Sequence, residues 1–200
     1  MSLNETEKKI YQLAKPFLCV MDNDLHTQDV IDLSFRLLSK EGGERNIVIP
    51  AAILHDVGYS MVPEEIRVSG RRPGGDIKLV RMHESEGVRI ASDILDKIAD
   101  DSLPVNEILE IIDGHDTRKD AISINDKIVK DADKLSRYSA TFWIIVERAR
   151  IDPKTLCKNL ESRAQKWFYL PSSREIANEK LIQRMEEIIE RNEKVLSSLG

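Results

Sequence analysis

The stretch that most constrains this chain is the apolar run NIVIPAAILHD, residues 46–56, which ends on a His-Asp doublet. A segment this apolar predicts a central helix that is buried on most sides, with Pro50 in its first turn. A buried strand is the alternative, but the sequence offers no second strand to pair with it. Because a buried ionisable side chain costs free energy unless it is paired or bound to a metal, His55 and Asp56 need partners from elsewhere in the chain.

Helical periodicity runs through most of the remaining chain, with apolar residues three and four positions apart. The pair Gly42-Gly43 is typical of a helix C-terminus and marks one of the ends. The expected helices cover residues 3–20, 26–43, 83–99, 104–116, 123–150 (as one or two helices), 153–169 and 174–197. Because no convincing strand accompanies them, we predict an all-α fold, a single-domain bundle of seven to nine helices.

Composition excludes several classes of protein. The net charge of −5 and the 5% aromatic content argue against bulk binding of DNA or RNA. No stretch approaches the roughly 20 apolar residues of a membrane span, and the N-terminus lacks an apolar signal core. Cys19 and Cys157 have no CxxC spacing, which predicts buried free thiols in a reducing compartment. We therefore expect a cytoplasmic protein that binds neither nucleic acid nor membrane.

The histidines of the chain each fall on or beside a different predicted helix. With two aspartates they form the ordered set His26, His55, Asp56, His83, His115 and Asp133. A helical bundle can build a metal site from inward-facing groups on separate helices. Imidazole and carboxylate together suit divalent metal ions, so we predict a site for a divalent metal such as Mn, Fe, Ni, Co, Zn or Mg. Either His83 or His115 could instead face solvent, and a single-metal site would survive without them.

This ordered set resembles the HD-domain family of metal-dependent phosphohydrolases, which is named for the His-Asp doublet. The matching pieces are DNDLHTQDV, AAILHDVGY, MHESEG, IIDGHD and VKDADKL. The resemblance implies that one metal ion is held by His26, His55, Asp56 and Asp133. It implies a second ion at His83 and His115, with Asp56 bridging, because a shared carboxylate can hold two cations about 3.5–4 Å apart.

Three other acidic residues lie close to these candidates. Asp131 is the rival of Asp133, but residues two apart do not share a helix face, and Asp133 directly precedes Lys134-Leu135 as the final Asp of the family does. We interpret Asp113 and Asp116, which flank His115, as solvated groups or as groups that orient an imidazole. The expected domain layout is therefore an N-terminal helix over 1–22, a metal-binding core over 23–150 and C-terminal helices packed on that core over 151–200.

Residues 59–81 are rich in Gly, Pro and Arg and predict a loop, into which Gly58 would release the chain. The segment is either a solvated mobile loop or a lid that binds phosphate, for which Arg forks are suited. The candidates for substrate binding are Arg71, Arg72, Lys78 and Arg81, together with Lys134 and Arg137 near the final Asp. The aromatic run WFYL, residues 167–170, is interpreted as the core end of a helix, or as a wall against a nucleobase or a dimer contact.

The resemblance implies hydrolysis of a phosphate ester or anhydride by a metal-activated water, with Asp56 or Asp133 as the proton acceptor. The expected partner is a phosphate-containing small molecule, a nucleotide above all, and a homodimer is compatible with the sequence. Tyr59 stands where the cyclic di-GMP-hydrolysing subgroup has Lys, so we do not expect that substrate. Two other interpretations stay open: an HD-type di-iron oxygenase with the same ligands, and a non-catalytic module that binds a nucleotide.

Overall fold

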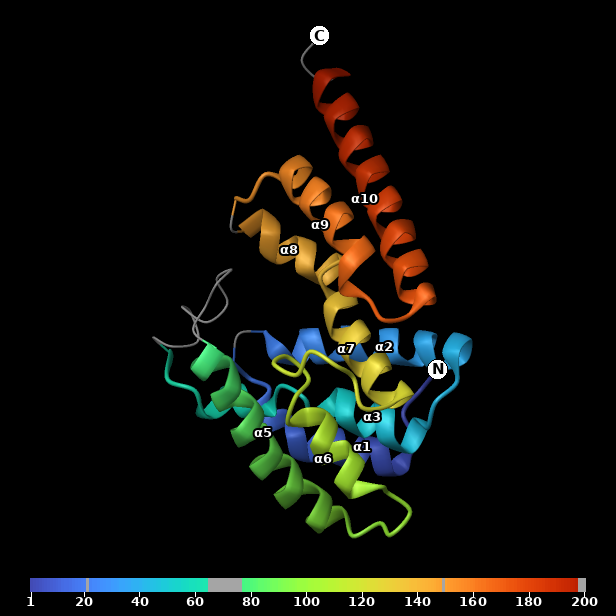
Figure 1. The fold of residues 1–200 in the computed structure, drawn as a ribbon. Helices are drawn as coiled ribbons and strands as arrows, with labels where there is room; N and C mark the ends of the chain where they lie inside the picture. Colours follow the sequence, from blue (N-terminus) through green and yellow to red (C-terminus); the bar gives the residue numbers. More distant parts are fainter. Residues whose placement is uncertain (21, 65–76, 149, 198–200) are drawn as a thin grey trace.

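The structure, a computed structural model, describes residues 1–20, 22–64, 77–148 and 150–197 (Figure 1). Its helices are α1 (Glu5–Ala14), α2 (Asn23–Glu41), α3 (Arg45–Leu54), α5 (Ile77–Ile98), α6 (Val105–Ile112), α7 (Ile124–Ser136), α8 (Ala140–Arg148), α9 (Pro153–Trp167) and α10 (Pro171–Ser197), with the short 3-10 helices η1 (Lys15–Phe17) and η2 (Val57–Met61). No strand occurs within these ranges, and the predicted all-α class is confirmed.

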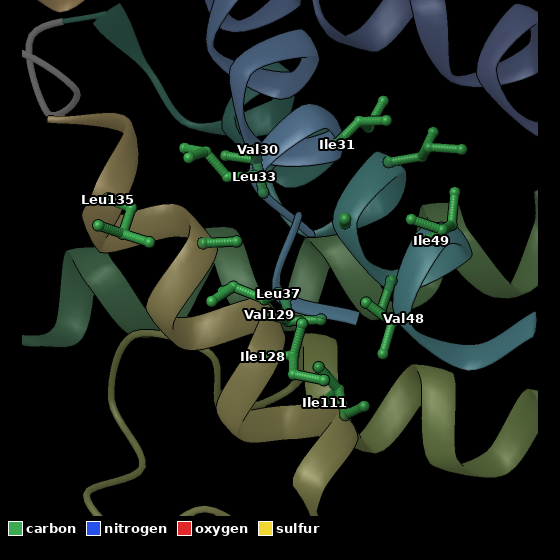
Figure 2. Packing of buried hydrophobic residues seen from close by; sticks show 14 of the residues in the cluster. Val30, Ile31, Leu33, Leu37, Val48, Ile49, Ile111, Ile128, Val129 and Leu135 are labelled. Atoms are coloured by element: carbon green, nitrogen blue, oxygen red, sulfur yellow. The ribbon is translucent and has the colours of Figure 1, made fainter. Parts of the chain in front are cut away.

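Helix α3 is the centre of the core, as its apolar sequence predicts. All of its residues from Ile47 to Leu54 are buried, and the helix contacts α1, α2, α6 and α7. Figure 2 shows Val48 of α3 in the same cluster as Leu37 of α2 and Ile128 of α7. Because every side of α3 meets another helix, the residues at its C-terminal end are held in the middle of the bundle.

Local signals fix several helix ends. The side chain of Asn4 accepts a hydrogen bond from the backbone N–H of Glu7, and Glu7 in turn accepts from Asn4, which forms a capping box at the start of α1. Gly42 ends α2 with a φ of +77°, a conformation that glycine adopts without strain. The prediction that Gly42 marks this C-terminus is confirmed.

Other predicted boundaries differ from the structure. Pro50 lies inside α3 rather than in its first turn. Helix α10 begins at Pro171, three residues before the predicted start, whereas the region 123–150, expected as one or two helices, forms the two helices α7 and α8. Proline is favoured at the first helical position because its missing N–H is not needed there, so Pro171 starts a helix instead of only ending one.

The segment after the doublet also departs from the sequence prediction. Gly58 lies in η2, which packs closely against α5, and α5 begins at Ile77, inside the predicted loop. A Cβ atom at Gly58 would lie only 1.9 Å from the carbonyl oxygen of His83. This glycine therefore permits a close approach of two backbones and does not simply release the chain into a loop.

Helices α8, α9 and α10 extend to one side of the other helices (Figure 1). Helix α10 packs on α9 and reaches α7 and α2. Of the two cysteines, Cys157 in α9 is buried as expected, whereas Cys19 is exposed, so half of that prediction is wrong. Within the described ranges, none of the helices combines the length and apolarity that a membrane crossing requires.

Candidate metal centre

The structure brings the predicted ligands together from separate elements. His26 lies near the start of α2, His55 and Asp56 follow α3, His83 lies in α5, His115 lies in the turn after α6, and Asp133 lies in α7. We call His26, His55, Asp56 and Asp133 the first cluster, and Asp56, His83 and His115 the second cluster. Apart from His26, whose side chain is 24% exposed, these residues are buried.

In the first cluster the donor atoms of His26, His55 and Asp56 all lie within 4.8 Å of one another, and Asp133 joins them through His26. His26 Nε2 lies 3.1 Å from His55 Nε2, 3.4 Å from Asp56 Oδ2 and 3.3 Å from Asp133 Oδ1. His55 Nε2 and Asp56 Oδ2 are 3.6 Å apart. Ligand atoms about 2.0–2.2 Å from a metal ion lie about 3–3.6 Å from one another, so these spacings fit a shared cation.

The second cluster uses the other oxygen of Asp56. His83 Nε2 and His115 Nε2 are 3.3 Å apart, and Asp56 Oδ1 lies 3.9 Å from the former and 3.4 Å from the latter. The donor atoms of Asp56, His83 and His115 all lie within 4.8 Å of one another. Asp56 therefore presents one oxygen to each cluster, which is the arrangement of a bridging carboxylate.

Backbone carbonyls orient two of the imidazoles. His55 Nδ1 lies 2.9 Å from the carbonyl oxygen of Ala52, and His115 Nδ1 lies 2.9 Å from that of Ile112. An Nδ1–H that donates to the carbonyl leaves Nε2 with its lone pair directed into the cluster. The ring of His83 is held by stacking on Tyr59 instead, with ring centroids 4.1 Å apart.

The electrostatics of the site favour bound cations. Burial would raise the pKa of Asp56, but the imidazoles of His55, His115 and His26 hold it well below its usual range. Burial likewise opposes ionisation of Asp133, but Arg137 and His26 lower its pKa. Two ionised carboxylates in a buried site require positive charge beside them, which divalent ions would supply.

The pKa values of the two histidines of the second cluster shift in opposite directions. Burial lowers the pKa of His83 to about 4. Burial also opposes the charge of His115, but a hydrogen bond to Asp56 and the nearby charge of Asp116 raise its pKa to about 10. The metal-free cluster thus keeps a proton on one imidazole, at the place where a cation would balance the carboxylates.

The predicted substrate-binding residues divide into three groups. Arg137 reaches the centre, with Nη1 3.8 Å from Asp133 Oδ2. Lys134 turns toward α9 and donates to the carbonyl oxygen of Trp167, and Arg81 binds Glu84 and Asp113. Arg71 and Arg72 lie outside the described residues, as does the side chain of Lys78.

The aromatic run at the end of α9 has a mixed character. Phe168 and Leu170 belong to the core, which supports the interpretation as a helix end. Trp167 is only partly buried, and the guanidinium of Arg137 lies 5.5 Å from its ring centroid. The ammonium of Lys134 lies 4.9 Å from the ring of Tyr169. One edge of the candidate site is therefore both aromatic and cationic.

Sequence reasoning gave too little weight to two acidic residues. Asp116 Oδ2 lies 3.5 Å from His83 Nε2 and 3.8 Å from His115 Nε2, so it is a neighbour of the second cluster. Glu84 is fully buried and binds the turn that carries His115. The available signal was adjacency, because each of these acids directly follows a predicted histidine ligand.

A model of the HD-domain family matches residues 24–138, more than half of the chain, and the chain therefore belongs to the HD-domain family. Among solved structures, it resembles a predicted HD superfamily hydrolase from an uncultured Thermotogales bacterium, with a TM-score of 0.57 and 20% identity over 96% of this chain and 92% of that one. At this identity the likeness shows a shared fold. The search of curated proteins found no match.

Proposed function

We propose that this HD-domain protein is a metal-dependent phosphohydrolase that cleaves a phosphate ester or anhydride of a nucleotide. The observation that carries the proposal is the position of Asp56, whose two oxygens face separate histidine clusters. Imidazole and carboxylate donors at these spacings fit divalent ions of the Mn, Fe, Co, Ni or Zn type. A pair of such sites sharing one carboxylate is typical of two-metal hydrolysis of phosphates.

The residues of the chain would divide the work as follows. The first and second clusters would hold the ions, which when bound make a water nucleophilic near neutral pH and screen the charge on phosphate oxygens. Asp56 and Asp133, both with lowered pKa, stay ionised as ligands and can accept a hydrogen bond from the attacking water. Arg137 would stabilise negative charge that develops on the phosphate.

The edge formed by Arg137 and Trp167 supports a nucleotide substrate. Burial lowers the pKa of Arg137, but the carboxylates of the centre, with Asp133 foremost, raise it above its usual value, so the guanidinium is charged. A charged guanidinium can bind a phosphate oxygen. The ring of Trp167 lies beside it, with the guanidinium of Arg163 on the ring as well, 4.8 Å from the ring centroid, and a base that stacks here would replace one of these arginine contacts.

The test is phosphate release from a panel of nucleotides with Mn²⁺, Fe²⁺, Co²⁺ or Ni²⁺. We expect activity that falls to background in His55→Ala and in Asp56→Ala, because each change removes a donor atom of the first cluster. Asp120→Asn is the matched control, since Asp120 is exposed and belongs to neither cluster. Undiminished turnover in both cluster variants would contradict the proposal. Oxygen consumption by the iron-loaded protein without phosphate release would favour the oxygenase instead.

A further inference from the structure

Asp116 lies close to both histidines of the second cluster. Its Oδ2 atom lies 3.5 Å from His83 Nε2 and 3.8 Å from His115 Nε2. Asp56 Oδ1 lies at 3.9 and 3.4 Å from the same two nitrogens. We propose that Asp116 is a ligand of the second metal ion, an inference that rests on the proposed two-metal centre.

With Asp116 included, the two metal sites have equivalent donor sets. The first cluster offers two imidazoles and the carboxylates of Asp56 and Asp133, and the second then offers two imidazoles and the carboxylates of Asp56 and Asp116. Asp116 differs from Asp56 in exposure, because 32% of its side-chain surface is open to solvent against 9% for Asp56. It is therefore the ligand on the side of the second ion that solvent can reach.

Glu84 holds the backbone of Asp116 from the side of α5. Its Oε1 accepts hydrogen bonds from the backbone N–H groups of Asp116 and Thr117, each at 2.9 Å. Its Oε2 accepts from the hydroxyl of Thr117 at 2.6 Å and from Arg81 at 2.7 Å. Glu84 directly follows His83 in α5. Two adjacent residues of this helix therefore supply a ligand of the second cluster and hold the turn that carries His115 and Asp116.

Lys130 holds the same turn from the side of α7. Its ammonium is almost completely buried and donates to the carbonyl oxygens of Gly114, His115 and Arg118, the last two at 3.0 and 2.9 Å. A buried charge is costly unless it is paired and hydrogen-bonded, so these bonds offset a large desolvation penalty. The turn of residues 113–117 is thus bound from two helices by charged groups of opposite sign.

Such a clamp has a functional reason if the turn presents two metal ligands. His115 and Asp116 are adjacent, and both would have to keep their donor atoms within a few tenths of an ångström of their positions around one ion. Side chains that orient metal ligands commonly alter metal affinity 10–100-fold when they are replaced. We therefore assign Glu84 as a positioning residue for the second site.

The test is a titration with Mn²⁺ followed by calorimetry, with bound manganese counted after gel filtration. We expect two ions in the wild type. In Asp116→Asn we expect one ion at unchanged affinity and a second bound at least tenfold more weakly. Asp120→Asn is the matched control, because Asp120 follows the same turn, is exposed and belongs to neither cluster. It should retain two ions at wild-type affinity.

Glu84→Gln separates positioning from direct ligation. We expect it to weaken the second ion about 10–100-fold while the first ion binds as in the wild type. Two ions at wild-type affinity in Asp116→Asn, or a single ion in the wild type that Asp116→Asn does not change, would overturn the assignment of Asp116. Failure of the proposed function is a distinct result, namely the predicted manganese binding with no phosphate release from any nucleotide.

Discussion

At the scale of single residues, Asp131 and Asp133 have separate tasks although they are two positions apart. Asp133 Oδ1 faces His26 in the first cluster. The Asp131 carboxylate instead accepts hydrogen bonds from the backbone N–H groups of Tyr169, at 3.1 Å, and Leu170, at 2.9 Å. The sequence favoured Asp133 through its match to the final Asp of the family, and Asp133 is the member of the pair that faces the cluster, but the sequence assigned no role to Asp131.

This division predicts opposite phenotypes for two alanine variants. Asp131→Ala leaves two backbone N–H groups without their acceptor, so we expect the free energy of unfolding to fall by about 1–3 kcal/mol with Mn²⁺ binding unchanged. Asp133→Ala should lose the first Mn²⁺ ion. Urea denaturation of the metal-free proteins and manganese counts measure the two effects. Loss of manganese in Asp131→Ala, with Asp133→Ala retaining both ions, would reverse our assignment.

Glu84 and Asp116 were undervalued for the same physical reason, which is that their contacts join segments far apart in the chain. Glu84 binds the N–H groups of Asp116 and Thr117, which lie 32 and 33 positions away in the chain. Such bonds depend on where a turn comes to rest against a helix, and neither periodicity nor residue type encodes that contact. The histidines could be selected as candidate ligands from the sequence, because their order along separate apolar helices is itself a sequence pattern.

At the scale of elements, the close packing of η2 against α5 brings the doublet and His83 together. A Cβ atom at Gly58 would lie 1.9 Å from the carbonyl oxygen of His83 and 2.5 Å from the backbone nitrogen of Gly87. Both neighbours are backbone atoms, so they can be relieved only by moving α5. From the sequence we expected Gly58 only to release the chain into a loop. The close approach could not be predicted, because a contact between two distant segments leaves no local signal.

We expect Gly58→Ala to lower the free energy of unfolding by about 3 kcal/mol, at the upper end of the usual cost of overpacking. It should also weaken the second Mn²⁺ ion, since His83 moves with α5. Gly87→Ala is the control from the same contact. Its nearest neighbour is a side-chain methyl of Ile112 at 3.3 Å, and alanine is favoured over glycine inside a helix by up to about 1 kcal/mol. A Gly58→Ala protein as stable as Gly87→Ala would contradict this account.

At the scale of the whole molecule, the candidate ligands come from α2, the end of α3, α5, the turn after α6, and α7, and none comes from α8, α9 or α10. The convergence of the ligands followed from the sequence, because buried ionisable groups on separate helices need one another. For residues 167–170 the sequence left a core, a nucleobase wall and a dimer contact open, because the contact of Trp167 with Arg137 arises only through the tertiary packing of α9.

Metal ions that bind this set of helices should stabilise one part of the chain more than the other. A ligand present at 100 times its dissociation constant adds about 2.7 kcal/mol to the free energy of unfolding. For a chain of this length, that corresponds to a rise in Tm of roughly 5–10 °C per site. We expect Mn²⁺ to produce this rise in thermal unfolding and EDTA to reverse it, with neither effect in a variant that carries both His55→Ala and His115→Ala.

Hydrogen exchange would locate the stabilisation. Removal of Mn²⁺ should reduce amide protection mainly in α2, α3, α5 and α7, because the ions join these helices to one another while none of the candidate ligands lies in α8 to α10. Amides of α9 that open independently of the core should exchange at the same rate with and without the ions. An equal loss of protection in α8 to α10 would mean that these helices open only with the core, and it would contradict the separation of the chain into a metal-bound part and a part packed beside it.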